Sequence, residues 1–348
     1  MKTKIICTLG PASETEEMLE KMIQAGMTVA RVNCSHGTTK WRQDIIRRIK
    51  KVREKLKADH VKIMLDMRGP EIRIGYFGDT YKKTGDNGFV MLKEGQTFTF
   101  HTKEITGTEK GVFINYDRLP KAVKIGQELL LNDGLIVMTV ESVTEDTVIA
   151  RVKVGGQLKD RKAMFVPGCD LCLPFISKED AEDIVMACKE DIDWVSPSFV
   201  SSAKDLHEFK AFLKENGRDY PLISKIESVT GYNNLTEILK VTEGIKVARG
   251  DLGVEYPYEL IPAMQKDIIT RTLKAKKIIV TATEMHETMI ERARPTRAET
   301  TDVANAVWDG TQLIMTSAET AVGKYPVETI KSMLKIAAEA EKHKKYYR

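Results

Sequence analysis

The chain has 348 residues, 42% of them hydrophobic, which is enough for one large barrel and a smaller second domain. Lysines and arginines (54) nearly balance aspartates and glutamates (50), so the net charge of +4 argues against nucleic acid or an anionic membrane as the main partner. We find neither an apolar run approaching the ~20 residues of a transmembrane helix nor the pattern of a signal peptide.

Short apolar, β-branched runs alternate with amphipathic patterns along most of the chain. Eight runs read as buried parallel strands, at 5–9, 28–32, 61–65, 193–197, 222–226, 244–248, 278–282 and 313–317. Eight segments read as helices, at 16–26, 41–57, 178–190, 203–217, 232–241, 261–276, 298–310 and 326–342. This alternation predicts an α/β fold in which the strands close into a (β/α)₈ barrel.

One interval breaks the alternation. Between about Ile74 and Phe165 the sequence shows β-branched segments separated by turn residues, at 96–100, 111–116, 135–143 and 147–154. We therefore expect residues 1–73 and 166–348 to form the barrel, and residues 74–165 to form a small all-β barrel inserted after its third strand. Such an insertion is suited to act as a lid that excludes water from the chemistry.

The ends of the predicted strands carry polar side chains, and in a barrel of this kind these ends build the active site. Lys225 and Glu227 are two residues apart on one strand and so point the same way. Asp251 follows the next strand and would complete a carboxylate pair suited to Mg²⁺ or Mn²⁺. Lys225 would then stabilise a transferring phosphoryl group, although a structural ion pair between Lys225 and Glu227 is the alternative.

Other rim residues give weaker signals. Gly250 would let backbone N–H groups approach an anion, or it forms a simple tight turn before the next helix. Arg31 is a candidate phosphate clamp. The oxygens of Asn33, Ser35 and Asp66 could share a monovalent cation.

The five cysteines are an odd number in a long chain without a signal peptide, which favours reduced thiols and a cytoplasmic location. Cys169 and Cys172 form a C-x-x-C. A zinc site of this type needs four ligands, and the sequence has no second pair. We expect ordinary packing at a domain junction instead.

The motifs resemble those of the pyruvate kinase family in collinear order along essentially the whole chain. They include IICTLGPAS (5–13), ARVNCSHGT (30–38), LDMRGPEIR (65–73), ISKIE (223–227), VARGDLGVE (247–255) and SAETAVGKYP (317–326). The resemblance implies phosphoryl transfer from phosphoenolpyruvate to ADP, giving pyruvate and ATP.

The resemblance also implies roles for particular residues. Lys225 would stabilise the phosphoryl group, Glu227 and Asp251 would hold the divalent ion, and Glu71 implies dependence on K⁺. The remaining roles are K⁺ binding by Asn33, Ser35, Asp66 and the Met67 carbonyl; substrate binding by Ala248, Arg249, Gly250, Thr283 and Arg73; phosphate and nucleotide contacts by Arg31, His36, Lys162 and Arg73; and enolate protonation through Thr283 and Ser317.

Some residues depart from the family pattern. Glu284 stands where glutamine is usual, Ala318 where glycine is usual, and Arg68 where lysine is usual. Glu284 is the most consequential, because an added carboxylate could repel an anionic substrate or alter a proton transfer. The family usually continues beyond position 348 into a C-terminal domain with effector sites. We accordingly expect no effector activation, and a homodimer through the barrel rather than a tetramer.

Two other functions remain open at this point. A lyase or aldolase on a related barrel would show similar metal carboxylates, but it would need neither Lys225 nor the inserted domain. A specialised or non-catalytic homologue that binds pyruvate-like ligands is the third possibility, and Glu284 is its best support.

Overall fold

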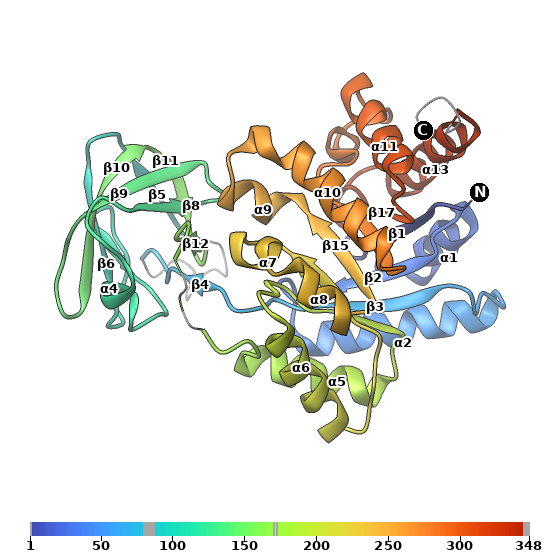
Figure 1. Cartoon of the computed structure of the whole chain (residues 1–348), viewed down its shortest axis with the longest axis horizontal. Coiled ribbons are helices and arrows are strands. Elements are labelled where there is room, and N and C mark those ends of the chain that lie inside the picture. Colours follow the sequence, from blue (N-terminus) through green and yellow to red (C-terminus); the bar gives the residue numbers. More distant parts are fainter. Residues whose placement is uncertain (1, 79–87, 170, 172, 344–348) are drawn as a thin grey trace. The chain divides into compact units, whose positions relative to one another are not determined.

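A computed structural model describes residues 2–78, 88–169, 171 and 173–343 (Figure 1). Its contacts divide the chain into two compact units, each described here by itself. The first unit comprises residues 1–69, 175–252 and 259–348, and the second comprises residues 70–174 and 253–258. Within the described ranges, no helix combines the length and apolar character that crossing a membrane requires.

The first unit is a parallel barrel surrounded by helices. Its strands follow the ring order β13, β3, β2, β1, β17, β16, β15 and β14. A parallel bridge between Val195 and Leu222 joins the two ends of this order and closes the ring. The strands are β1 (Lys4–Thr8), β2 (Val29–Asn33), β3 (Lys62–Asp66), β13 (Trp194–Ser196), β14 (Ile223–Ile226), β15 (Gly244–Ala248), β16 (Ile278–Ala282) and β17 (Leu313–Thr316). The predicted α/β barrel is thus confirmed, with each strand within one or two residues of its expected bounds.

The helices of this unit begin and end at residues suited to helix termini. Thr15 caps α1, which ends at Gly26 with φ 114°, while Ser202 and Thr296 form capping boxes at α6 and α11. Figure 1 shows α1 and α13 on the same side of the barrel. The helices are α1 (Glu16–Ala25), α2 (Thr39–Lys55), α5 (Lys178–Glu190), α6 (Ala203–Glu215), α7 (Val229–Asn233), α8 (Leu235–Val241), α9 (Arg249–Glu255), α10 (Ile261–Lys274), α11 (Arg297–Asp309), α12 (Ala318–Ala321) and α13 (Pro326–His343).

Two expectations need correction. The helix predicted at 232–241 is two helices, α7 and α8, because the Ser228 side chain accepts a hydrogen bond from the Gly231 N–H and starts helical structure earlier. Gly250 is not in a tight turn before a helix, because residues 249–255 are themselves the helix α9.

The second unit is built from strands. Seven of them pair in the order β4, β12, β8, β9, β10, β6 and β7, and a bridge between Ile74 and Ile114 links the two ends of this curled sheet. Phe98 and Phe100 meet edge to face in its core, 5.3 Å between ring centroids. The elements are β4 (Ile72–Arg73), β5 (Phe89–Leu92), β6 (Thr97–His101), β7 (Gly111–Phe113), α4 (Leu119–Ala122), β8 (Glu128–Leu131), β9 (Ile136–Val143), β10 (Thr147–Val154), β11 (Gly156–Lys159) and β12 (Ala163–Phe165).

This unit extends beyond the predicted bounds of 74–165 for two reasons. The strand β4 lies before Ile74 and pairs with β12, so it belongs to this sheet. At the other end, Val166 lies in the core of this unit and Leu173 packs against that core. Cys172, half of the C-x-x-C, lies outside the described residues, whereas the Cys169 thiol donates a hydrogen bond to the Ala122 carbonyl.

Candidate active site

The inside of the barrel is layered. An apolar layer formed by Ile6, Val29, Met64, Ile223, Val280, Ala282, Leu313 and Met315 fills its interior. Arg31, Asp66 and Lys225 each lie two residues after a member of that layer, so the strand period turns them inward as well. The resulting charged cluster lies at the carboxyl ends of the strands, which is where barrel enzymes place their chemistry.

Asp66 is the centre of this cluster. Its Oδ2 accepts hydrogen bonds from Arg31 Nε and Lys246 Nζ, and its Oδ1 lies 3.4 Å from Lys225 Nζ. Burial would raise the pKa of Asp66, but the three surrounding cations outweigh it and hold the pKa well below its usual range. Asp66 is therefore a fixed negative charge. Arg31 is held in turn by a 2.8 Å hydrogen bond to Thr8 Oγ1.

Lys225 on β14 is surrounded by oxygen atoms. Its Nζ lies 2.8 Å from Glu227 Oε1 and donates a 2.6 Å hydrogen bond to Ser198 Oγ. Burial lowers the pKa of Lys225, but the carboxylates of Asp66, Glu227 and Asp251 overcome this effect and raise it above the usual lysine value. The side chain is thus an ammonium at every physiological pH.

Glu227 and Asp251 offer oxygen atoms to a divalent cation. The fully buried Glu227 accepts a 2.7 Å hydrogen bond at Oε2 from the Phe199 N–H. Its Oε1 accepts no well-directed hydrogen bond from the described residues, although the Lys225 ammonium is near. Asp251, in the first turn of α9, is half-buried and close enough for its charge to act on Lys225. Mg²⁺ commonly takes one or two protein carboxylates and completes its coordination with water and substrate, so these two carboxylates are a donor set of that kind. Among the described residues, no group of three or more His, Cys, Asp or Glu suited to a metal occurs.

The residues expected to bind a monovalent cation lie along the ends of β2 and β3. The half-buried Asn33 accepts a 3.1 Å hydrogen bond at Oδ1 from the Ser35 N–H, and Ser35 itself is exposed. The Met67 carbonyl accepts a 2.6 Å hydrogen bond from Ser198 Oγ. Asp66 Oδ1 accepts no well-directed hydrogen bond from the described part of the chain. These oxygen atoms have the chemistry that an alkali cation prefers.

The backbone after β16 adopts an unusual conformation. Thr283 and Glu284 both have positive φ values, 74° and 54°. A positive φ is rare for a β-branched residue, and such strain is found preferentially at functional sites. Arg249 stabilises this segment, because its guanidinium donates hydrogen bonds to the Ala282 and Thr283 carbonyls and pairs with Asp302 at 2.7 Å. The Arg249 side chain thereby positions Thr283.

Glu319 connects the ends of β16 and β17. Its buried carboxylate accepts hydrogen bonds from the Ser317 N–H at 2.6 Å and from the His286 N–H at 3.1 Å. Two backbone N–H groups thus donate hydrogen bonds to the Glu319 carboxylate, and the carboxylate in turn holds the backbone of Ser317 in place. Gly250 is also constrained, because a Cβ at this position would lie 3.1 Å from Thr283 Cγ2.

The remaining predicted residues lie elsewhere. His36 is exposed on the first unit, where its carbonyl accepts a hydrogen bond from Arg42. Arg73 and Lys162 belong to the second unit. There Arg73 pairs with Glu71 and lines a cavity of about 460 Å³, while Lys162 lies 3.1 Å from Asp133 Oδ2.

Three residues of the site, Ser198, Lys246 and Glu319, were not predicted from the sequence. The strand-end pattern assigned no role to Ser198, which accepts a hydrogen bond from Lys225, or to Glu319, which accepts one from the Ser317 N–H. Lys246 was not considered, although a lysine inside the apolar strand GIKVA is a visible signal. It is 0% exposed, and burial, with the adjacent Lys225 and Arg31, lowers its pKa to about 7 against the opposing charge of Asp66.

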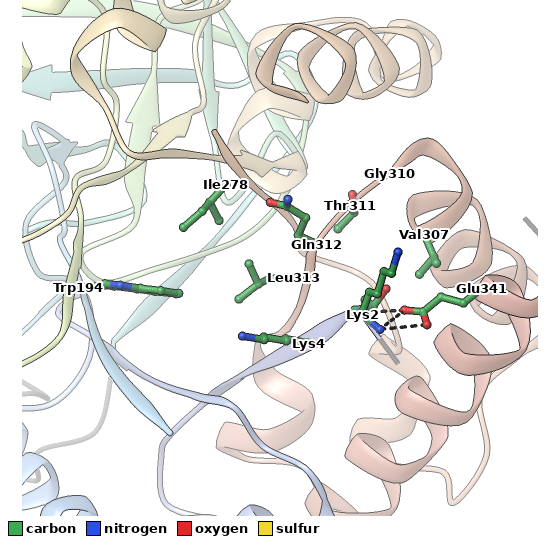
Figure 2. Close-up of a pocket in the computed structure, with 11 residues that line it drawn as sticks. Lys2, Lys4, Trp194, Ile278, Val307, Gly310, Thr311, Gln312, Leu313 and Glu341 are labelled. Atoms are coloured by element: carbon green, nitrogen blue, oxygen red, sulfur yellow. Dashed lines mark hydrogen bonds between the residues drawn. The ribbon is translucent and has the colours of Figure 1, made fainter. Parts of the chain in front are cut away.

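One cavity of the barrel unit lies at the opposite end of the strands (Figure 2). It measures about 810 Å³ and is lined by residues at or just before strand starts, among them Lys4, Trp194, Ile278 and Leu313. The charged cluster follows the ends of the same strands. The presence of a large cavity therefore does not identify the active site. The clustered charges and the strained backbone place the candidate active site at the other end of the barrel, where the strands end.

Comparisons with known proteins agree with this geometry. A family model described as the barrel domain of pyruvate kinase matches residues 1–330. The protein named pyruvate kinase of Thermotoga maritima is 45% identical over 346 residues, covering 99% of this chain and 72% of the relative. Those of Staphylococcus haemolyticus and Staphylococcus aureus USA300 are 41% and 42% identical, with 99% of this chain and 58% of each relative covered. The chain thus spans less than two thirds of these two relatives, and it belongs to the pyruvate kinase family.

Proposed function

We propose that this protein transfers the phosphoryl group of phosphoenolpyruvate to ADP, forming pyruvate and ATP. The observation that carries the proposal is the largely buried Lys225 ammonium, held between Asp66, Glu227 and Ser198 at a barrel rim in a chain of this family. A cation that is largely shielded from water and stays charged is suited to stabilise the charge of a phosphoryl group in flight.

In the proposed reaction the bond between the enol oxygen and phosphorus breaks, and a bond between phosphorus and a terminal oxygen of ADP forms. Lys225 stabilises the transferring group, and Arg31 contacts phosphate. The enolate then takes a proton at its methylene carbon to give pyruvate, through the polar route that contains Thr283 and Ser317. The strained Thr283 is held by Arg249, and the Ser317 backbone is held by Glu319, so both are preorganised for this step.

The proposal includes two kinds of ion. Glu227 and Asp251 would hold Mg²⁺ or Mn²⁺, which when bound neutralises phosphate charge and orients the substrate. Asn33, Ser35, Asp66 and the Met67 carbonyl would hold K⁺. The backbone of Ala248, Arg249 and Gly250 would frame the substrate carboxylate, while Arg73, His36 and Lys162 would serve the nucleotide and phosphate. A cytoplasmic location and a homodimer through the barrel remain predictions from the sequence.

A coupled assay with phosphoenolpyruvate, ADP, Mg²⁺ and K⁺ tests the proposal. Lys225→Met should lower kcat by roughly 10²–10³-fold, the usual cost of losing one preorganised electrostatic contact. Lys266→Met is the matched control, because Lys266 is an exposed lysine paired with Asp309 on the outside of the barrel. Pyruvate release without ADP would instead indicate a lyase, and ligand binding without turnover would indicate a non-catalytic homologue.

The expected K⁺ dependence has its own test. Replacing KCl with tetramethylammonium chloride at equal ionic strength should depress turnover strongly, because the bulky cation cannot enter a cage of protein oxygen atoms. Unchanged turnover would remove K⁺ from the proposal and leave the phosphotransfer itself standing.

A further inference from the structure

A lysine lies inside the barrel with no exposed surface. Lys246 is the central residue of β15, and its neighbours Ile245 and Val247 are also buried. In the parallel register Lys246 lies directly beside Lys225 of β14, so both ammonium groups point into the same interior. Among the described residues, the Lys246 side chain donates a hydrogen bond to Asp66 Oδ2.

We propose that Lys246 is a positioning residue of the reaction, holding the Asp66 carboxylate from within the barrel so that Lys225 stays available to the phosphoryl group. This inference rests on the proposed phosphotransfer function. Lys246 acts through Asp66 and is not assigned a contact with substrate.

The two oxygen atoms of Asp66 have separate partners. Oδ2 takes both Lys246 Nζ and Arg31 Nε, whereas Oδ1 faces Lys225 at the longer distance of 3.4 Å. Because Lys246 and Arg31 anchor Oδ2, the carboxylate cannot turn or shift toward Lys225. Without Lys246, one of the two anchors is lost, and the carboxylate is free to form a closer ion pair with Lys225.

The charges of the cluster support the same conclusion. Arg31 and Lys225 carry two positive charges against the three carboxylates Asp66, Glu227 and Asp251, and the protonated form of Lys246 supplies the third. Removing Lys246 leaves an excess of negative charge around Lys225. That excess would draw the Lys225 ammonium toward the carboxylates and repel an anionic substrate.

A purely structural role explains Lys246 poorly. Burying an ammonium beside a second ammonium costs free energy, and an apolar side chain of similar volume usually fills a barrel interior at least as well. Asp66 would still keep Arg31 and Lys225 as partners after the change. The substitution Lys246→Met should therefore leave the barrel folded and no less stable than wild type.

Kinetics of Lys246→Met test the proposal, with Lys266→Met as the exposed-lysine control. We expect kcat to fall about tenfold or more and KM for phosphoenolpyruvate to rise at least about threefold, because the excess negative charge repels this anionic substrate, while the urea midpoint does not fall. Unchanged kcat in the folded variant would overturn the proposal. Failure of both Lys246→Met and Lys246→Gln to fold would show a structural role and would overturn it equally.

A double-mutant cycle tests whether Lys246 acts through Asp66. In the Asp66→Asn background, Lys246→Met should change kcat by less than about twofold, because the carboxylate that it positions is gone. A full additional loss of kcat in this background would contradict the proposal.

If the wild-type protein shows no turnover, the proposed phosphotransfer function fails, and the role of Lys246 needs a separate test. That test is the affinity for phosphoenolpyruvate in the presence of Mg²⁺, measured by calorimetry on the wild type and on Lys246→Met. Weaker binding by the variant would support the role of Lys246, and equal affinity would overturn it.

Discussion

Replacing His286 with leucine should stabilise the barrel, because its imidazole ring is buried with no hydrogen-bond partner among the described residues. Its side chain is 0% exposed, and neither ring nitrogen has a hydrogen-bond partner among the described residues. A buried polar group left unsatisfied costs about 1–3 kcal/mol. Leucine removes that cost and keeps the backbone N–H that donates to Glu319. At neutral pH we expect a gain of that order in the free energy of unfolding.

The gain should grow as the pH falls. Burial lowers the pKa of His286 from 6.5 to about 4, against a smaller opposing effect of Glu299. Between these two values the unfolded chain binds more protons than the folded chain, so wild-type stability is lost as the pH falls through this window. Between pH 7.5 and pH 5 the loss amounts to about 2 kcal/mol. The variant lacks this titration, so its advantage should widen by the same amount.

Urea unfolding followed by tryptophan fluorescence measures this difference. All three tryptophans, Trp41, Trp194 and Trp308, belong to the first unit, so the signal reports on the barrel. His60→Leu is the control, because His60 is exposed and the substitution is chemically the same. An advantage of His286→Leu that is identical at the two pH values would refute the linkage argument. A loss of stability at both would refute the account of an unsatisfied histidine.

Two further predictions concern stability. Asp183→Ala should cost about 3–5 kcal/mol in urea unfolding, because it leaves the guanidiniums of Arg42 and Arg68, 2.7 Å and 3.0 Å from this buried carboxylate, without their shared partner. Gly69→Ala should cost more than Gly217→Ala, although both glycines have φ near 75° (77° and 75°), because only at Gly69 would the new Cβ lie 2.7 Å from another side chain. Equal costs of the two glycine substitutions, measured by the same unfolding curves, would show that backbone strain alone matters.

The order of the strands and much of the charged cluster could be predicted from sequence for a physical reason. Buried parallel strands are continuous apolar runs, and their period of two residues fixes which neighbours point inward. Lys225 and Glu227 could be placed on one face by that period alone. Asp66 could be placed at the same rim, although on a strand that does not adjoin theirs, because the carboxyl ends of all the parallel strands meet there.

The rest of the cluster depends on how the barrel closes. Lys246 could have pointed to either face of β15, and only the register with Lys225 shows that it points inward. The left-handed backbone of Thr283 has no sequence signature, because a threonine favours the opposite sign of φ. It is held by Arg249, a residue that sequence reasoning assigned to substrate. Tertiary contacts therefore decide where charge and strain accumulate, and local patterns do not reveal them.

Lys246 and His286 separate two ways in which a buried titratable group can be retained. Lys246 has an anionic partner in the charged cluster, so its removal should cost activity without costing stability. The His286 ring has no hydrogen-bond partner in the described part of the chain, so its removal should raise stability, and activity should persist because the hydrogen bonds of Glu319 are to backbone N–H groups. The two substitutions should therefore change different properties: Lys246→Met lowers activity without lowering stability, and His286→Leu raises stability without lowering activity. Measuring both variants in one series of unfolding curves and initial rates thus tests whether the charged interior of this barrel is maintained for catalysis.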